Sequence, residues 1–147
     1  MSLKDELKTS LVSAAKAKDQ VLLDTIRAVQ SAIRYKEIEK KSEFSDAEII
    51  AVISTLCKQR RESIDQFQKG GRADLVAKET RELEILQKYL PAQLSEEEVK
   101  QTIQKIIADT GAKGPADMGR VIKEAMKQFA GKADGKAVSE LVKSLLK

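Results

Sequence analysis

The 147-residue sequence predicts an all-α protein, and three observations support this fold class. Most of the chain consists of Ala, Leu, Ile, Lys, Glu and Gln, which are mostly good helix formers. Apolar residues recur at the three- and four-residue spacing of helices, and none of the β-branched residues alternates with polar residues as in a strand. The seven glycines and two prolines are mostly gathered at a few positions, where they are expected to separate helices.

Residues 1–90 predict four helices. Ser2 is a candidate N-cap with Asp5 three residues later, and Ser45 with Glu48 forms a capping box. Gly70 stands where a glycine commonly ends a helix. The expected helices cover residues 2–18, about 19–41, 45–70 and about 73–90. The expected core stripe of the second helix consists of Leu22, Ile26, Val29, Ile33 and Ile38.

Residues 91–147 predict a smaller helical piece after Pro91. Ser95 and Glu98 form a second capping box, Pro115 suits the first position of a helix, and Asp134 is a candidate N-cap. The expected helices cover residues 95–109, 115–129 and 134–146. The sequence therefore predicts two helical subdomains: an N-terminal bundle of about four helices over residues 1–90 and a three-helix bundle over residues 94–147.

The composition excludes several classes of chemistry. The absence of histidine and the presence of one cysteine exclude zinc fingers, disulfides within the chain, and Ser-His-Asp or Cys-His catalysis. Glu79 and Glu82 are expected to form ion pairs on the surface of their own helix, beside Lys78 and Arg81. Cys57 is expected to fill the core. We therefore expect no catalytic residue, no cofactor and no metal.

Clusters of basic residues are the candidate nucleic-acid contacts. In the C-terminal piece they follow a spacing of three and four residues, which lines one side of a helix and can neutralise RNA phosphates. A solvated helix face explains the same pattern. The five aromatic residues are widely scattered, so recognition would rest on shape and backbone and not on stacked bases. The candidate nucleic-acid-binding residues are Arg120, Lys123, Lys127, Lys136, Lys58 and Arg61.

The compartment is inferred from cysteine use and hydropathy. A single cysteine in a chain without disulfides is typical of a reducing compartment. No apolar run approaches the roughly 20 residues of a membrane span, and the N-terminus shows no signal peptide. The sequence therefore predicts a cytoplasmic protein with no membrane partner.

Several segments together resemble the YqeY-like proteins, and the resemblance covers essentially the whole chain. Its most specific part is residues 71–95, and the other matching segments are residues 27–33, 58–64 and 117–121. The resemblance implies a helical protein of two subdomains. A similar module forms the tail of the B subunit of the glutamine-dependent tRNA amidotransferase. That enzyme converts mischarged glutamyl- or aspartyl-tRNA to the amidated form, and its tail helps to hold the tRNA.

The resemblance implies a role in contact with tRNA. It also carries the family label of a carbon–nitrogen ligase with glutamine as the amido-N donor. Nothing in the sequence matches the Ser-Ser-Lys arrangement of the amidase or the kinase-like ATP-using part of the B subunit. The leading hypothesis is therefore a non-catalytic module that binds tRNA weakly and in a salt-dependent way, together with a protein partner in aminoacyl-tRNA metabolism. The alternatives are a protein–protein adaptor and an enzyme that acts on an amide or on aminoacyl-tRNA.

Overall fold

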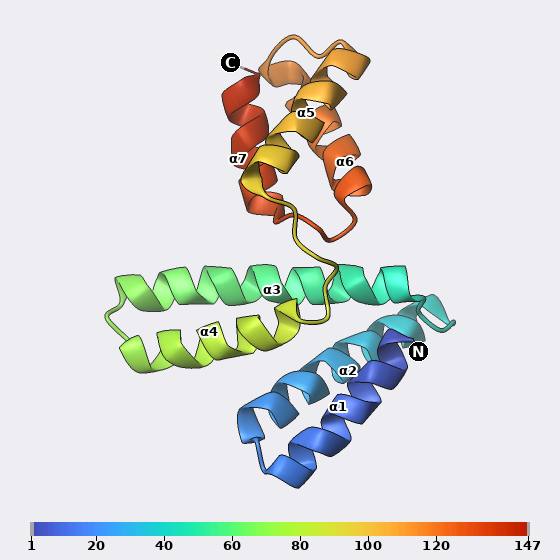
Figure 1. Ribbon diagram of the computed structural model, residues 1–147, viewed down its shortest axis with the longest axis vertical. Coiled ribbons are helices and arrows are strands. Elements are labelled where there is room, and N and C mark those ends of the chain that lie inside the picture. The colour runs from blue at the N-terminus through green and yellow to red at the C-terminus, as the bar shows by residue number, and fades with distance from the viewer. Residues whose placement is uncertain (1, 147) are drawn as a thin grey trace. The chain divides into compact units, whose positions relative to one another are not determined.

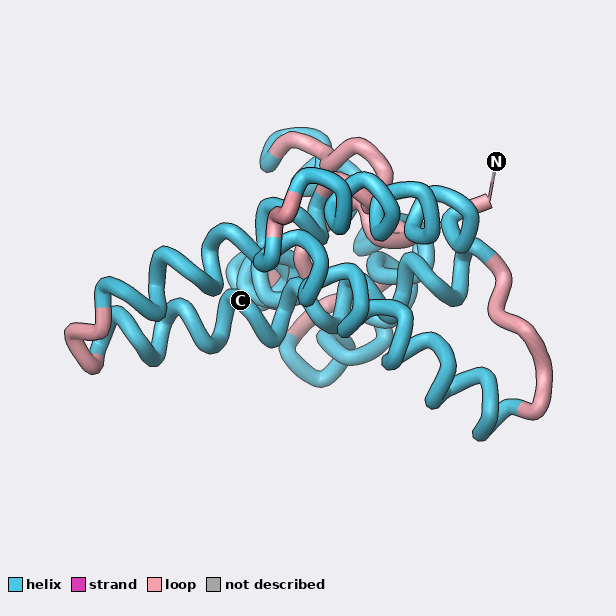
Figure 2. The backbone as a smooth tube through the Cα atoms, turned by 90° about the horizontal axis from the view of Figure 1, so that it is seen from below, coloured by secondary structure: helices cyan, strands magenta, loops and turns pink. Residues whose placement is uncertain are grey.

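In the computed structural model, which describes residues 2–146, all regular elements of those residues are helices (Figure 1). The all-α prediction is confirmed. Figure 2 shows the helices joined by loops, with no strand in the described part of the chain. The chain divides into two compact units, one of residues 1–90 and one of residues 91–147. Each unit has its own hydrophobic core.

The first unit consists of two helical hairpins. Their helices are α1 (Leu3–Ala17), α2 (Gln20–Lys40), α3 (Asp46–Lys69) and α4 (Ala73–Gln87). In Figure 1, α1 lies antiparallel to α2 and α3 lies antiparallel to α4, while α2 also packs on α3 and α4. The predicted helix starts are confirmed: Ser2 Oγ accepts the Asp5 N–H at 3.2 Å, and Ser45 with Glu48 closes a capping box.

Side chains from all four helices form the core of the first unit. Cys57 on α3 is buried in it, which confirms its expected place. The expected core position of Ile38 is wrong, because its side chain is 70% exposed. Ile38 follows Ile33 by five residues, which turns it about 140° around the helix, away from the core. The buried residues of the core cluster are Leu7, Ile26, Val29, Ile33, Ile49, Val52, Ile53, Cys57 and Leu86.

The fourth helix ends earlier than its apolar pattern predicts. It stops at Gln87 and not at Leu90. The N–H groups of Tyr89 and Leu90 donate to the carbonyls three residues earlier, which marks a tightened last turn. Pro91 disfavours the α conformation in the residue before it, which explains the early end. Tyr89 and Leu90 still pack against the core.

The second unit contains α5 (Glu96–Thr110), the short 3-10 helix η1 (Pro115–Asp117), α6 (Met118–Phe129) and α7 (Gly135–Leu145). The capping box of Ser95 and Glu98 starts α5 as predicted. The single helix expected from Pro115 instead begins as a 3-10 turn, in which the Asp117 N–H donates to the Gly114 carbonyl. The Asp117 carboxylate accepts the Lys113 N–H at 3.1 Å, so it holds the preceding loop and does not cap α6.

The segment before α5 is fastened to the loop between α6 and α7. The Leu94 N–H donates to the Lys132 carbonyl at 2.8 Å, and Gln93 Nε2 donates to the Gly131 carbonyl at 2.9 Å. These bonds fix where α5 begins relative to the other two helices of the unit. None of the helices in residues 2–146 combines the length and the apolar character that a membrane crossing needs.

Candidate nucleic-acid interface

The helix α6 has one buried face and one basic face. Val121, Ala125 and Phe129 are 0 to 1% exposed and form the buried face. The residues of the basic face, Arg120, Lys123 and Lys127, are exposed. At about 100° per residue the basic side chains fall within about 60° of one another, on the side opposite the buried face. The structure therefore brings these three predicted residues together on one exposed strip.

Arg120 has local partners, whereas the two lysines do not. Its Nη2 lies 3.2 Å from Asp117 Oδ1 and 3.4 Å from the Thr110 carbonyl. The Arg120 side chain remains 57% exposed, and an ion pair in such a position stabilises little. No ion pair involves Lys123 or Lys127 within residues 2–146. The strip therefore presents three cations, with Asp117 beside Arg120 and Glu124 on the same side of α6, one helical turn from Arg120 and from Lys127.

The other predicted basic residues lie elsewhere. Lys136 is exposed in the first turn of α7, and Lys127 lies in the last turn of α6, so both stand near the loop that joins these helices. Lys58 is exposed on α3, where Arg61 is half-buried. These two lie in the first unit, and the other four lie in the second. The sequence pattern placed Lys58 and Arg61 in one cluster and the other four residues in another, and the structure brings together the three on α6.

The second unit also contains an acidic groove. It has a volume of about 470 Å³ and lies against the first turns of α5 and α7. Glu96, Asp134 and Glu140 line it, together with apolar side chains such as Leu94 and Leu141. None of the basic residues of α6 lines this groove. The three basic side chains of α6 form an exposed surface of their own.

A charged cluster between α3 and α4 was missed by the sequence argument. Arg60 Nε lies 2.8 Å from Glu82 Oε2 and 3.4 Å from Glu79 Oε2. The Glu79 oxygen is buried and accepts no hydrogen bond from the described residues, so the contact with Arg60 is what offsets its burial. The expected pairing on the surface of one helix is wrong for these two glutamates. The three side chains pair with one another and join α3 to α4.

Arg81, the expected partner on α4, reaches a different helix. Its Nη2 lies 2.8 Å from Asp19 Oδ2, and Asp19 also caps α2 by accepting the Leu22 N–H. The i,i+3 and i,i+4 rule describes neighbours on one helix and carries no information about a facing helix. Such contacts can therefore be predicted only once the packing of α4 on α2 and α3 is known.

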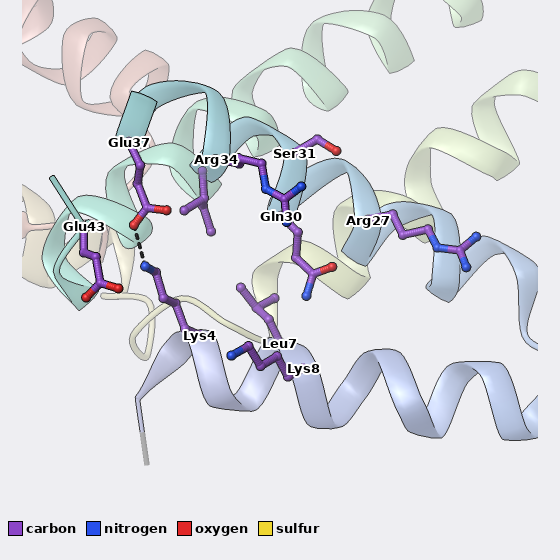
Figure 3. Close-up of a pocket in the computed structure, with 10 residues that line it drawn as sticks. Lys4, Leu7, Lys8, Arg27, Gln30, Ser31, Arg34, Glu37 and Glu43 are labelled. Atoms are coloured by element: carbon purple, nitrogen blue, oxygen red, sulfur yellow. Dashed lines mark hydrogen bonds and ion pairs between the residues drawn. The ribbon is translucent and has the colours of Figure 1, made fainter. Parts of the chain in front are cut away.

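A second basic site, also missed, is a groove between α1 and α2. It has a volume of about 490 Å³ and contains four basic side chains (Figure 3). Two come from α1 and two from α2, where they are spaced by four and by seven residues. This spacing places each pair on one face of its helix and can be read from the sequence. The basic residues of the groove are Lys4, Lys8, Arg27 and Arg34.

The described residues contain no group of three or more Cys, Asp or Glu side chains that could hold a metal ion. The charged groups of the candidate interface are the exposed basic side chains of α6. These can form hydrogen bonds and ion pairs with anionic oxygens, which is what binding to a phosphate backbone requires.

Comparison with protein families gives one match over nearly the whole chain. The family described as Yqey-like protein matches residues 4–146. The match includes both units and all the basic residues described above. The resemblance found from the sequence segments is confirmed.

Similar curated proteins come from yeasts and share one name, "Altered inheritance of mitochondria protein 41, mitochondrial". The protein of Kluyveromyces lactis is 38% identical over 136 residues, which cover 90% of this chain and 69% of the relative. The protein of Lachancea thermotolerans is 31% identical over 150 residues, which cover 97% and 76%. The protein of Saccharomyces cerevisiae is 38% identical over 109 residues, which cover 71% and 56%.

These names overturn one expectation. The sequence predicted a cytoplasmic protein, and that prediction is wrong, because the similar curated proteins are named as mitochondrial. The argument failed because a single cysteine and a lack of apolar spans report on redox state and on lipid insertion. Neither property distinguishes one reducing compartment from another.

Proposed function

The chain belongs to the YqeY-like protein family, and from this membership we propose that it is a non-catalytic helical module that associates with tRNA. The observation that carries the proposal is the exposed basic strip of Arg120, Lys123 and Lys127 on α6. The resemblance to the tail of the tRNA amidotransferase B subunit supports the choice of tRNA among anionic partners. The names of the yeast relatives lead us to place this role in mitochondria.

The strip would bind the sugar–phosphate backbone. From Arg120 to Lys127 the helix rises about 10 Å, so the three cations can face neighbouring phosphates of one strand. Each phosphate that is neutralised releases counterions, which makes the affinity fall with salt. The one aromatic residue of residues 91–147, Phe129, is 1% exposed. The second unit thus offers no ring for a base to stack on, and the proposed recognition is of shape and backbone.

The proposal leaves bond-making to a partner enzyme. The sequence contains no histidine, and the partly buried charges of Arg60, Glu79 and Glu82 are engaged with one another. The carbon–nitrogen ligase label of the family would then describe the complex in which such a module works. A protein partner in aminoacyl-tRNA metabolism is part of this proposal.

A second candidate function, that of a protein–protein adaptor, is favoured by one observation. Tyr35 and Ile38 are three residues apart on α2 and are 67% and 70% exposed. Residues at this spacing share a helix face, and exposed aromatic and aliphatic side chains are common contact residues in protein interfaces.

The test is a titration of fluorescently labelled, folded tRNA with the full chain at low salt, read by anisotropy. We expect saturable binding with a dissociation constant in the micromolar range or weaker, on the order of 10⁻⁶ to 10⁻⁴ M. The variant R120E/K123E/K127E should lose at least about tenfold in affinity, because three attractive contacts become repulsive.

A matched control distinguishes a defined strip from general charge. K100E/K105E/K113E makes the same change in net charge at exposed lysines of the second unit outside α6. It should keep most of the affinity. Absence of binding by the wild-type chain, or equal losses in the two triple variants, would exclude the strip as the tRNA contact. Recovery of a defined protein partner after nuclease treatment, together with the absence of tRNA binding by the wild-type chain, would instead favour the adaptor.

A further inference from the structure

We propose that the groove between α1 and α2 is a binding site for a ligand that carries two neighbouring phosphate groups. This site lies in the first unit, apart from the basic strip of α6, and does not depend on the tRNA proposal. Two kinds of ligand carry neighbouring phosphate groups: a free di- or triphosphate, and a polynucleotide with two consecutive phosphates.

The groove has an apolar floor and polar walls. Its floor includes Leu7 and Ile33, which are 1% and 4% exposed and belong to the core. Gln30 extends from α2 toward α1 in Figure 3, and Ser31 is a second neutral hydrogen-bonding group in the lining. A volume of about 490 Å³ is within the range of small-molecule sites. The groove is thus large enough for a nucleotide-sized ligand.

The acidic residues of the groove leave most of its cations available. Glu37 forms an ion pair with Lys4 and also accepts the Phe44 N–H at 2.7 Å, so its carboxylate is committed (Figure 3). Glu43 is the other acid of the lining. The groove therefore carries four cations against two carboxylates, a net charge of +2.

The remaining three cations have no ion pair within residues 2–146. They are Lys8 on α1 and both Arg27 and Arg34 on α2. Figure 3 shows Arg34 beside Gln30, with Arg27 farther along the same helix. Glu37 attracts Arg34 and Asp5 attracts Lys8, so part of this positive charge is offset. The remaining positive charge favours a bound anion, and the low-dielectric floor strengthens that attraction.

The number of cations in the groove indicates the class of anion. Arg27 and Arg34 are seven residues apart, which is two helical turns or about 10 Å along α2. The two guanidinium groups must bend toward each other to reach the same diphosphate, and each can then hold a different phosphate with its planar fork. Lys8 lines the groove from α1 as a compact third charge. Because three cations of the groove form no ion pair within residues 2–146, a ligand with two phosphates can satisfy more of them than a single carboxylate or phosphate can.

The experiment titrates the full chain with inorganic pyrophosphate at low salt and records amide chemical shifts by NMR, with inorganic phosphate as the single-group comparison. We expect saturable shifts in α1 and α2 with pyrophosphate, and at least tenfold weaker binding of inorganic phosphate. The variant R27Q/R34Q should bind pyrophosphate at least tenfold more weakly than the wild type. Glutamine keeps the helix propensity of arginine, so the fold should survive.

The control variant K16Q/K36Q removes the same charge from exposed lysines of α1 and α2 that do not line the groove. It should bind pyrophosphate within twofold of the wild type. R120E/K123E/K127E should do so as well, which separates this site from the tRNA proposal. If R27Q/R34Q fails to fold, K8Q serves as the test variant, with an expected loss of at least threefold.

Two competition arms identify the source of the phosphates. Displacement of pyrophosphate by ATP but not by a short single-stranded RNA would assign the groove to free di- or triphosphates. Displacement by RNA at lower concentration than ATP would assign it to a polynucleotide. The proposal is overturned if the wild type shows no saturable shift in α1 and α2 with pyrophosphate, or if K16Q/K36Q weakens binding as much as R27Q/R34Q does.

Discussion

Glu37 is the residue whose contacts fasten α1 to α2 and to the loop that follows. Its carboxylate pairs with Lys4 and accepts the Phe44 N–H. The hydrogen bond from Lys4, and after it the bond from Phe44, lowers the pKa of Glu37 from its ordinary value of 4.5. A lowered pKa means that the folded chain favours the ionised form. The stability from Glu37 is therefore fully present above pH 4.5 and is lost as the pH falls through the folded-state pKa.

The variant E37Q should be less stable than the wild type at neutral pH and should depend less on pH under acidic conditions. The melting temperatures of the two proteins should converge as the pH is lowered. Protonation of Glu37 removes its negative charge from the wild type, and the substitution removes the same charge from the variant. Thermal unfolding followed by tyrosine fluorescence measures this, since Tyr35 and Tyr89 both lie in the first unit and tryptophan is absent. E39Q, at an exposed position of α2, is the control. Parallel pH profiles for E37Q and the wild type would contradict the account.

Cys57 gives a second measurement at the scale of one residue. Its side chain is 1% exposed in the core of the first unit, so a reagent reaches the sulfur only when the unit opens. We expect the native chain to resist a thiol-reactive dye and to react at a rate that follows unfolding as urea is added. Full labelling within the mixing time in the absence of denaturant would show that the thiol is accessible in the native fold.

At the scale of the elements, the contact between α3 and α4 depends on Arg60. Its guanidinium faces Glu79 and Glu82, whose side chains are 19% and 13% exposed. Glu79 and Glu82 lie on the next helix, 19 and 22 residues farther along the chain, so no pattern within one helix predicts the pairing. Removing the cation would leave two half-buried carboxylates side by side, which is costlier than losing an exposed ion pair.

The variant R60M should lower the free energy of unfolding by about 1–3 kcal/mol, between the values for exposed and for buried pairs. R81M breaks the more exposed pair with Asp19 and should cost less than about 1 kcal/mol. The triple variant R60M/E79Q/E82Q should recover part of the loss. Urea unfolding followed by tyrosine fluorescence measures all three. An R60M that is no less stable than R81M would contradict the assigned role of Arg60.

Helix starts were predictable from the sequence, and helix ends and faces were predictable only in part. Ser45 and Ser95 begin their helices as expected, because a capping box is a local set of hydrogen bonds within four residues. The exposure of Ile38 and the early end of α4 depend on which side of a helix meets its neighbour and on the turn before Pro91. The exposure of Ile38 is set by tertiary packing, and the end of α4 by the restriction that Pro91 places on the residue before it.

For the whole molecule, the sequence was most informative about fold class and family, and least informative about the second basic site. The strip on α6 was predictable because its three cations share one helix and one spacing. The groove between α1 and α2 was not recognised, because its cations come from two helices and meet only when the hairpin forms. The four charges of that groove follow helical spacing within each helix, so the signal becomes useful once α1 and α2 are known to pair.

The measurement that tests the central claim most directly is the salt dependence of tRNA affinity. For the wild type, the logarithm of the association constant should fall linearly with the logarithm of salt concentration. Replacing Arg120, Lys123 and Lys127 with glutamate should reduce the steepness of that line by about three, one for each phosphate that the strip no longer neutralises. An unchanged slope in this variant, or a wild-type affinity that does not respond to salt, would contradict the account of α6 as the surface that holds a tRNA backbone.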